Sequence, residues 1–137
     1  MNFKLDIVDS QRKIYSGDAI KLTIPAAKGE MTVLANHMPI ITPVGLGEIA
    51  VETPNKKISL TVGKGVFSFI NNYATLLVED TSYSEEISES LAMEAKRRAE
   101  EIIQKGIKGP DFEAALETIK RSNLDLKVIR KRKFLHN

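Results

Sequence analysis

The segment from Gly29 to Gly47 reads GEMTVLANHMPIITPVGLG. It begins with a glycine turn, continues through a short apolar run, and reaches a loop in which His37 stands close to Pro39. A second apolar run follows and ends between two glycines. Glycine, asparagine and proline favour turns, so the segment predicts short strands joined by tight loops.

The same pattern of short strands extends on both sides of this segment, from Phe3 to about Thr81. Apolar residues alternate with polar ones in three stretches: Phe3, Leu5 and Ile7; Ile20, Leu22 and Ile24; Ile58, Leu60 and Val62. Turn sequences such as Ser16-Gly17-Asp18 and Pro54-Asn55 separate the stretches. Many short strands at this spacing predict a β-sandwich or a barrel.

After Ser84 the apolar residues recur every three or four positions, which is the spacing of one face of a helix. The first such stripe comprises Ile87, Leu91, Ala95, Ala99, Ile102 and Ile103, and the second comprises Phe112, Ala115, Leu116, Ile119, Leu126 and Ile129. Ser82 and Glu85 have the spacing of a capping box at the start of the first helix. Gly106 and Gly109-Pro110 are expected to end it and to begin the second. The two helices should form an antiparallel hairpin.

The first helical stripe is rich in alanine, which buries little apolar area at ~25 cal/mol per Å². A packed hairpin and an extended form are then close in free energy, which is what a conformational switch requires. A plain rigid hairpin is the alternative that the sequence leaves open.

Composition excludes several classes of protein. The 137 residues suffice for one domain or a small domain with an appendage, and 42% hydrophobic content can supply a core. Cysteine is absent and only His37 and His136 carry imidazoles, so no disulfide framework and no metal site is expected. The apolar run from Met38 to Leu46 is too short and interrupted for a membrane span. The start of the chain lacks the pattern of a secretory signal, so we expect it to remain where it is made.

Charge is distributed unevenly along the chain. Residues 1–84 carry eight basic and eight acidic side chains, whereas residues 120–137 carry seven basic and one acidic. The terminal segment could meet nucleic acid, anionic lipid or an acidic protein surface. Solvated cations at the C-terminal end of a helix are the plainer interpretation.

No catalytic constellation is recognisable in the sequence. Gly63-Lys64-Gly65 lacks the spacing of a phosphate-binding loop and is better explained as a hairpin turn. His37 has the chemistry of a general base, but no serine or carboxylate can be assigned to it from the sequence. We therefore interpret His37 as a structural or interface residue, and a small enzyme built around it is the least favoured reading.

The segment Gly29–Gly47 resembles the signature of the epsilon subunits of F-type rotary ATP synthases. The resemblance rests on Gly29-Glu30, on Asn36-His37-Met38-Pro39 and on the run from Ile40 to Gly47. The stretch from Ala92 to Glu101 is similar to the first C-terminal helix of bacterial members. Asn36 stands where many members have glycine, and asparagine also tolerates positive φ. Thr32 and Met38 replace smaller residues of the family, which leaves the fold unaffected.

The resemblance implies an α+β protein in which an N-terminal antiparallel β-sandwich, residues 1–84, precedes a two-helix antiparallel hairpin, residues 85–137. It implies a non-catalytic central-stalk subunit of a proton-translocating enzyme, without a bound cofactor, that couples the rotating c-subunit ring to the gamma subunit. Glu30 would face the ring, and His37 with Pro39 would lie near gamma. Such a subunit belongs at the cytoplasmic face of the bacterial plasma membrane, as a peripheral part of the complex without membrane insertion.

The hairpin would be the regulatory element. If it extended, its basic residues could meet acidic surface on the alpha and beta subunits and inhibit ATP hydrolysis. These residues are Lys120, Arg121, Lys127, Arg130, Lys131, Arg132 and Lys133. The rival interpretation is a nucleic-acid-binding adaptor, which has little support because only Phe134 is an aromatic residue among the basic ones.

One departure from the family concerns nucleotide binding. Some bacterial epsilon subunits bind ATP through an I/L-D-x-x-R-A motif at the start of the first helix. The corresponding segment here is Ile87-Ser88-Glu89-Ser90-Leu91-Ala92, in which Ser88 replaces the Asp and Leu91 replaces the Arg. Losing charge-assisted contacts of this kind typically removes more than ~1.5 kcal/mol, so we expect weak or absent ATP binding.

Overall fold

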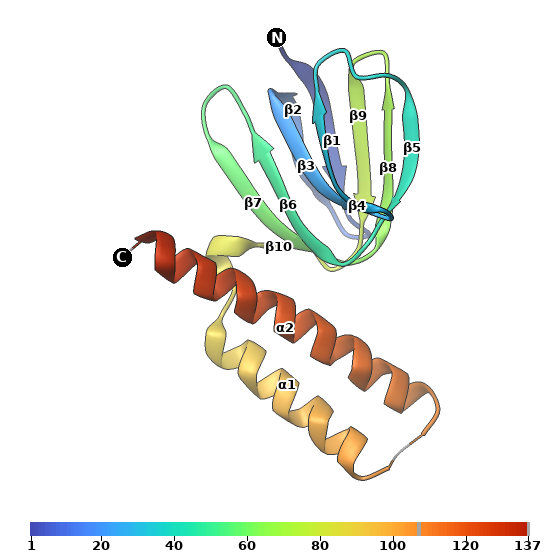
Figure 1. The fold of residues 1–137 in the computed structure, drawn as a ribbon, viewed down its shortest axis with the longest axis vertical. Coiled ribbons are helices and arrows are strands. Elements are labelled where there is room, and N and C mark those ends of the chain that lie inside the picture. The colour runs from blue at the N-terminus through green and yellow to red at the C-terminus, as the bar shows by residue number, and fades with distance from the viewer. Residues whose placement is uncertain (107, 137) are drawn as a thin grey trace. The chain divides into compact units, whose positions relative to one another are not determined.

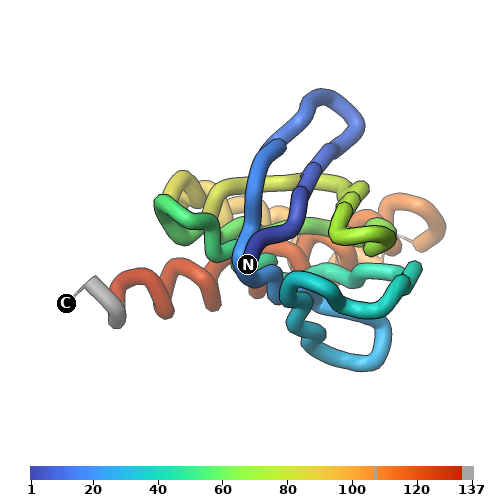
Figure 2. The backbone as a smooth tube through the Cα atoms, turned by 90° about the horizontal axis from the view of Figure 1, so that it is seen from above, coloured from blue at the N-terminus to red at the C-terminus, as the bar shows by residue number. Residues whose placement is uncertain are grey.

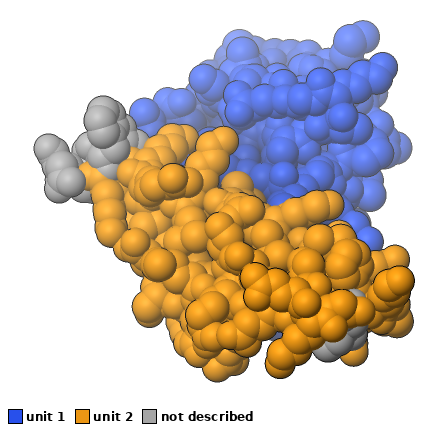
Figure 3. Space-filling model, turned by 60° about the horizontal axis from the view of Figure 1, so that its bottom comes forward, with its two compact units in different colours: residues 1–83 blue, residues 84–137 orange. Residues whose placement is uncertain are grey.

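The computed structural model describes residues 1–106 and 108–136, and it divides the chain into two compact units (Figure 3). Unit 1 comprises Met1–Tyr83 and unit 2 comprises Ser84–Asn137. Unit 1 holds all the strands and unit 2 holds the helices, as the sequence predicted (Figure 1). The expected fold class, a β-sandwich followed by a two-helix hairpin, is confirmed.

Unit 1 is one ten-stranded sheet whose strands follow the order β10-β7-β6-β3-β5-β8-β9-β1-β2, with β4 paired to β3. The strands are β1 (Phe3–Val8), β2 (Lys13–Ala19), β3 (Lys21–Ala26), β4 (Gly29–Leu34), β5 (Ile40–Val44), β6 (Gly47–Glu52), β7 (Lys57–Val62), β8 (Gly65–Ile70), β9 (Tyr73–Val78) and β10 (Ser82–Tyr83). β1 pairs in parallel with β9, and the other pairs are antiparallel. Figure 2 shows the β1–β2 hairpin, at one end of this order, as a separate loop of chain.

The sheet folds over at β3, which pairs with β6 along its first half and with β5 only at Ala26. The strands before and after this corner form two layers whose inner faces enclose the core. The largest fully buried side chains are Phe3, Phe67, Phe69, Leu5, Ile7, Leu22, Ile24, Ile49, Leu60, Leu76 and Val33. The rings of Phe3 and Phe69 meet edge to face at 5.6 Å. In β1 and β3, alternation of apolar and polar residues thus marks the buried face.

Gly65 occupies the tightest point of the sheet. A Cβ atom added there would lie 2.0 Å from the backbone oxygen of Leu77, so no other residue fits without moving β9. Gly63 and Lys64 connect β7 to β8, which begins at Gly65. The expected hairpin turn is wrong, because β7 pairs with β6 and β10 while β8 pairs with β5 and β9.

Unit 2 consists of a 3₁₀ turn, η1 (Ser84–Glu86), and the helices α1 (Glu89–Gln104) and α2 (Pro110–His136). The helices lie side by side in opposite directions (Figure 1). Gly106 and Gly109 adopt φ of 71° and 88°, and Pro110 is the first residue of α2, as expected. Small residues line the contact: Ala92, Ala99, Ala115 and Ser122 are buried.

Two expectations for the first helix are wrong. α1 begins after Ser88 rather than after Ser82, and the Ser88 side chain accepts the backbone N–H of Leu91 at 3.4 Å. Ser82 belongs to β10, where it pairs with Thr61. Leu91, which was expected on the buried stripe, is 68% exposed, and its neighbour Ala92 is buried instead. Ala92 and Ala99 are seven residues apart, about two turns, and share the buried face, whereas Leu91 lies about 100° around the helix from Ala92.

Candidate docking surfaces

The loop between β4 and β5 is fixed by two asparagines. Asn36 has a φ of 65°, a conformation that asparagine tolerates better than most residues. Its backbone N–H donates to the side-chain oxygen of Asn72 at 2.6 Å, and the Asn72 amide donates back to the side-chain oxygen of Asn36 at 2.8 Å. This reciprocal pair ties the loop to the turn between β8 and β9.

His37 follows directly and is half-buried. Its Nδ1 lies 2.8 Å from the Met38 carbonyl, which can only accept, so Nδ1 carries the proton. The ring meets Phe69 edge to face at 5.8 Å between centroids. His37 is therefore held by the sandwich core, and its Nδ1 is engaged with the backbone. Met38 and Pro39 project beside it, Met38 being 73% exposed.

Glu30 lies near the turn between β3 and β4, where it is paired with Pro25. The preceding Gly29 has a φ of 119°, which favours glycine, and the Glu30 side chain is exposed. Glu30 is the second residue of β4 and His37 follows its end, and the six residues of β4 span roughly 17 Å. The two candidate contacts thus lie at opposite ends of the sandwich and belong to two surfaces.

A third surface was not foreseen. Apolar side chains cover the outer face of β5, β8 and β9: Ile41, Pro43, Val66, Ile70, Tyr73 and Leu77. We call these six residues the outer apolar face. Ile41 is 71% exposed and Leu77 is 52% exposed. The strand register places Val66 between Pro43 and Leu77 in one row and Ile70 beside Tyr73 in another. The row between these two holds Ile41 together with the polar residues Ser68 and Thr75.

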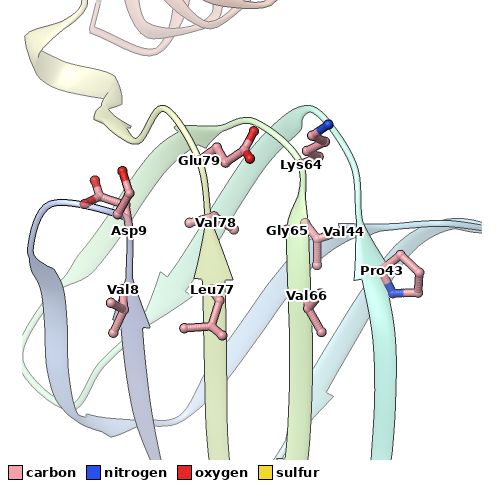
Figure 4. A pocket seen from close by; sticks show the side chains of 11 residues that line it. Val8, Asp9, Pro43, Val44, Lys64, Gly65, Val66, Leu77, Val78 and Glu79 are labelled. Carbon is pink, nitrogen blue, oxygen red and sulfur yellow. The ribbon is translucent and has the colours of Figure 1, made fainter.

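The outer apolar face ends in a shallow hollow of ≈ 570 Å³. Val8, Pro43, Val66 and Leu77 form its wall, and Figure 4 shows them side by side on adjacent strands. Lys64 and Glu79 lie at its edge. This end of the sheet is the one that carries the turn before Glu30, because Val44 pairs with both Ala26 and Gly65.

The sequence contains a signal for this face that the alternation analysis missed. In β8, Phe67 and Phe69 point into the core, and the alternate positions on the outer face are Val66, Ser68 and Ile70, two of which are apolar. A strand that is apolar on both faces is typical of a sheet that is covered on both sides.

Several of the seven basic residues of α2 have partners within unit 2. The Arg121 side chain lies 3.2 Å from Asp125 in the same helix. Arg132 donates to the backbone oxygens of Ser84, at 2.7 Å, and of Ile87, at 3.4 Å. Lys133 lies 2.5 Å from the carboxylate of Glu89. Lys120, Lys127, Arg130 and Lys131 are exposed, whereas the side chains of Phe134 and His136 lie outside the described residues.

The described residues offer neither a metal site nor a membrane-spanning helix. No group of His, Asp and Glu within 1–106 and 108–136 is arranged to hold a metal ion. In the same part of the chain, neither α1 nor α2 has the length and hydropathy of a membrane span.

The fold and these surfaces define a class: a small β-sandwich joined to a helical hairpin, with exposed surfaces suited to neighbouring subunits. Comparison with known proteins identifies the class further. The beta-sandwich domain of the ATP synthase delta/epsilon chain matches residues 2–83. The ATP synthase epsilon chain of Pelotomaculum thermopropionicum is 36% identical over 102 residues, which cover 74% of this chain and 76% of that one.

Two solved assemblies contain chains with the same fold. One is the Euglena gracilis mitochondrial ATP synthase, OSCP/F1/c-ring, with a TM-score of 0.70 and 17% identity over 99% of this chain and 82% of that chain. The other is the central stalk and c-ring of the Tetrahymena thermophila enzyme, with a TM-score of 0.64 and 11% identity over 90% of this chain and 93% of that chain. The present chain belongs to the family of ATP synthase epsilon chains, which are non-catalytic subunits.

Proposed function

We propose that the chain is a rotor subunit of the central stalk and that its outer apolar face, together with the His37 loop, docks on the gamma subunit. The exposure of six apolar side chains on this face carries the proposal, because exposed apolar patches on soluble proteins mark interaction sites. The loop is continuous with the face, since His37 contacts Phe69 in β8 and Asn36 is bonded to Asn72 beside Tyr73. The turn that carries Glu30, at the end of the sandwich opposite the His37 loop, is left for the c-subunit ring.

This arrangement suits a part that transmits torque. The core of unit 1 is closed around three buried phenylalanines. The loop that carries His37 is hydrogen-bonded to the turn between β8 and β9. A rigid body between gamma and the ring turns both together. The solved neighbours belong to assemblies described as containing a c-ring, which supports the same placement. We place the subunit as a peripheral part of the complex at the cytoplasmic face of a bacterial membrane.

Cysteine protection tests the docking. The chain has no cysteine, so a single Ile41→Cys variant reports only on its own position. In the free chain a maleimide should label it readily, and in the complex with gamma the labelling rate should fall at least tenfold. Ala50→Cys, exposed on β6 in the other layer, is the matched control and should stay reactive. Equal labelling of Ile41→Cys in both states would contradict docking through this face.

We further propose that α2 inhibits ATP hydrolysis when the hairpin extends toward the alpha and beta subunits. Its 27 residues span about 40 Å, which gives a detached helix a long reach. The exposed Lys120, Lys127 and Arg130 would meet acidic surface there. Each exposed ion pair contributes only ~0.2 to 1 kcal/mol, so several must act together.

Deleting residues 110–137 should raise ATP hydrolysis by the assembled complex while leaving coupling largely intact. A finer variant replaces Lys120, Lys127 and Arg130 by Gln, which leaves the contacts within the hairpin in place. It should raise hydrolysis in the same direction by a smaller amount. Unchanged hydrolysis in both would remove the inhibitory function from the account.

A further inference from the structure

We propose that the hairpin is held closed by an ionic latch at its open end, made by Arg132 and Lys133 of α2 with Ser84, Ile87 and Glu89. The proposal rests on the inhibitory function proposed for α2 and identifies what restrains it. The contacts join positions 44 to 48 residues apart in sequence, at the end of the hairpin remote from its connecting loop.

The Arg132 side of the latch satisfies backbone groups. Ser84 and Ile87 precede α1, so their carbonyl oxygens lie outside its hydrogen-bond ladder. The guanidinium donates to both, from Nη1 at 2.7 Å and from Nη2 at 3.4 Å. The planar guanidinium of Arg132 thus holds the last turns of α2 against the segment from Ser84 to Ile87. Ser84 and Ile87 are themselves buried, so the fork acts at a packed contact.

The Lys133 side of the latch is an ion pair. Its Nζ lies 2.5 Å from Glu89, the first residue of α1. The pair also places a carboxylate at a helix N-terminus, where negative charge is favoured. Beneath it, Ile87, Val128 and Ile129 form a small buried cluster with Leu124. This cluster is small, so its burial contributes little to the stability of the closed hairpin. The polar contacts at its edge therefore make a larger share of that stability.

The same cations therefore have two uses that exclude each other. The pair of Arg121 with Asp125 lies within α2 and persists when the hairpin opens. The contacts of Arg132 and Lys133 cross to the α1 side and are lost on opening. When α2 is extended, the side chains of Arg132 and Lys133 become available to an acidic partner. In the closed hairpin both are bonded to the α1 side. Removing the latch from the α1 side should open the hairpin and strengthen inhibition.

Glu89→Gln makes this test, because it breaks the ion pair and leaves all seven basic residues of α2 unchanged. Spin labels on Leu91→Cys and Asn123→Cys, both exposed, report the separation of the helices in the full chain. We expect the ratio of open to closed chains to rise about 1.4- to 5-fold, which corresponds to the ~0.2 to 1 kcal/mol of one exposed ion pair. Glu86→Gln, the same charge change three residues earlier, should leave the distances as in the parent chain.

A charge exchange checks that the pair itself is responsible. Glu89→Lys should open the hairpin further than Glu89→Gln, and the addition of Lys133→Glu should restore closed distances. The latch would be overturned if the spin-label distances in Glu89→Gln equal those of the parent chain, or if Lys133→Glu does not restore closed distances in Glu89→Lys. Either result counts against the latch independently of the effect of deleting residues 110–137.

The second readout is ATP hydrolysis by the assembled complex, which Glu89→Gln should lower relative to the parent chain. Opened distances with unchanged hydrolysis would overturn the regulatory role of the latch. The inhibitory function of α2 is judged separately, by the deletion.

Discussion

At the scale of single residues, the loop from Asn36 to Pro39 explains why a histidine without catalytic partners has a defined place. The His37 ring is held by Phe69 on one side and by the Met38 carbonyl on the other. The sequence predicted a structural or interface histidine, and the role toward gamma stays a prediction. The Asn36–Asn72 pair could not be predicted, because it joins positions 36 residues apart.

Asp6 gives a prediction at the same scale. The Ser16 hydroxyl donates to its carboxylate at 2.6 Å, and the Tyr73 hydroxyl donates to the other oxygen. These two hydrogen bonds, that of Ser16 first, hold the Asp6 pKa below its usual value of 3.8. The ionised form is therefore favoured by folding. Its contribution to stability is complete above the usual pKa and is lost as pH falls through the lowered one.

Asp6→Asn should lower the free energy of unfolding at pH 7 by about 0.5 to 1.5 kcal/mol, the range of a typical hydrogen bond. Urea denaturation at pH 7 and again near pH 2 measures the difference from the parent chain, which should shrink at the lower pH. Asp80→Asn, an exposed control, should show no such convergence. A difference that stays constant with pH would refute this role for Asp6.

At the scale of elements, strands were easier to predict than helix ends. Alternation in β1 marks its buried residues. In β7 the polar residue Thr61 is also buried, and in β8 the outer face carries Val66 and Ile70, so alternation does not describe these strands. On α1 the buried stripe includes Ala92 and not Leu91, and the helix is capped by Ser88 and not by Ser82. Several serines precede α1, and local sequence does not decide between them when tertiary contacts such as those of Arg132 fix the segment.

The first turn of α1 carries the prediction on ATP. Ser88 is engaged as the helix cap and Leu91 is exposed, so neither of the two motif positions offers a charged group. Isothermal titration of the full chain should show no binding at micromolar ATP. The double variant Ser88→Asp/Leu91→Arg should bind at least tenfold more tightly than the parent, because aspartate also caps helices and an exposed position accepts arginine. Micromolar affinity in the parent chain would show that other residues bind the nucleotide.

At the scale of the whole molecule, fold class and family could be read from the sequence, since periodicity changes once, near Ser84, and Gly29–Gly47 carries the family signature. The docking surfaces and the contacts of the hairpin could not be read from the sequence. Register between strands far apart in sequence brings Ile41, Val66 and Leu77 together, and the long-range contacts of Arg132 and Lys133 appear only when the hairpin is folded.

The central claim is that the chain docks on gamma through the outer apolar face. The most direct test is co-purification of the full chain with a tagged gamma subunit from the same source. The parent chain should elute with gamma in equal amounts. The variant Ile41→Lys/Leu77→Lys, which changes only exposed side chains, should elute separately, and Thr32→Lys/Ala50→Lys, on exposed positions of β4 and β6, should bind like the parent. Failure of the parent chain to bind gamma, or equal binding by the outer-face variant, would contradict the claim.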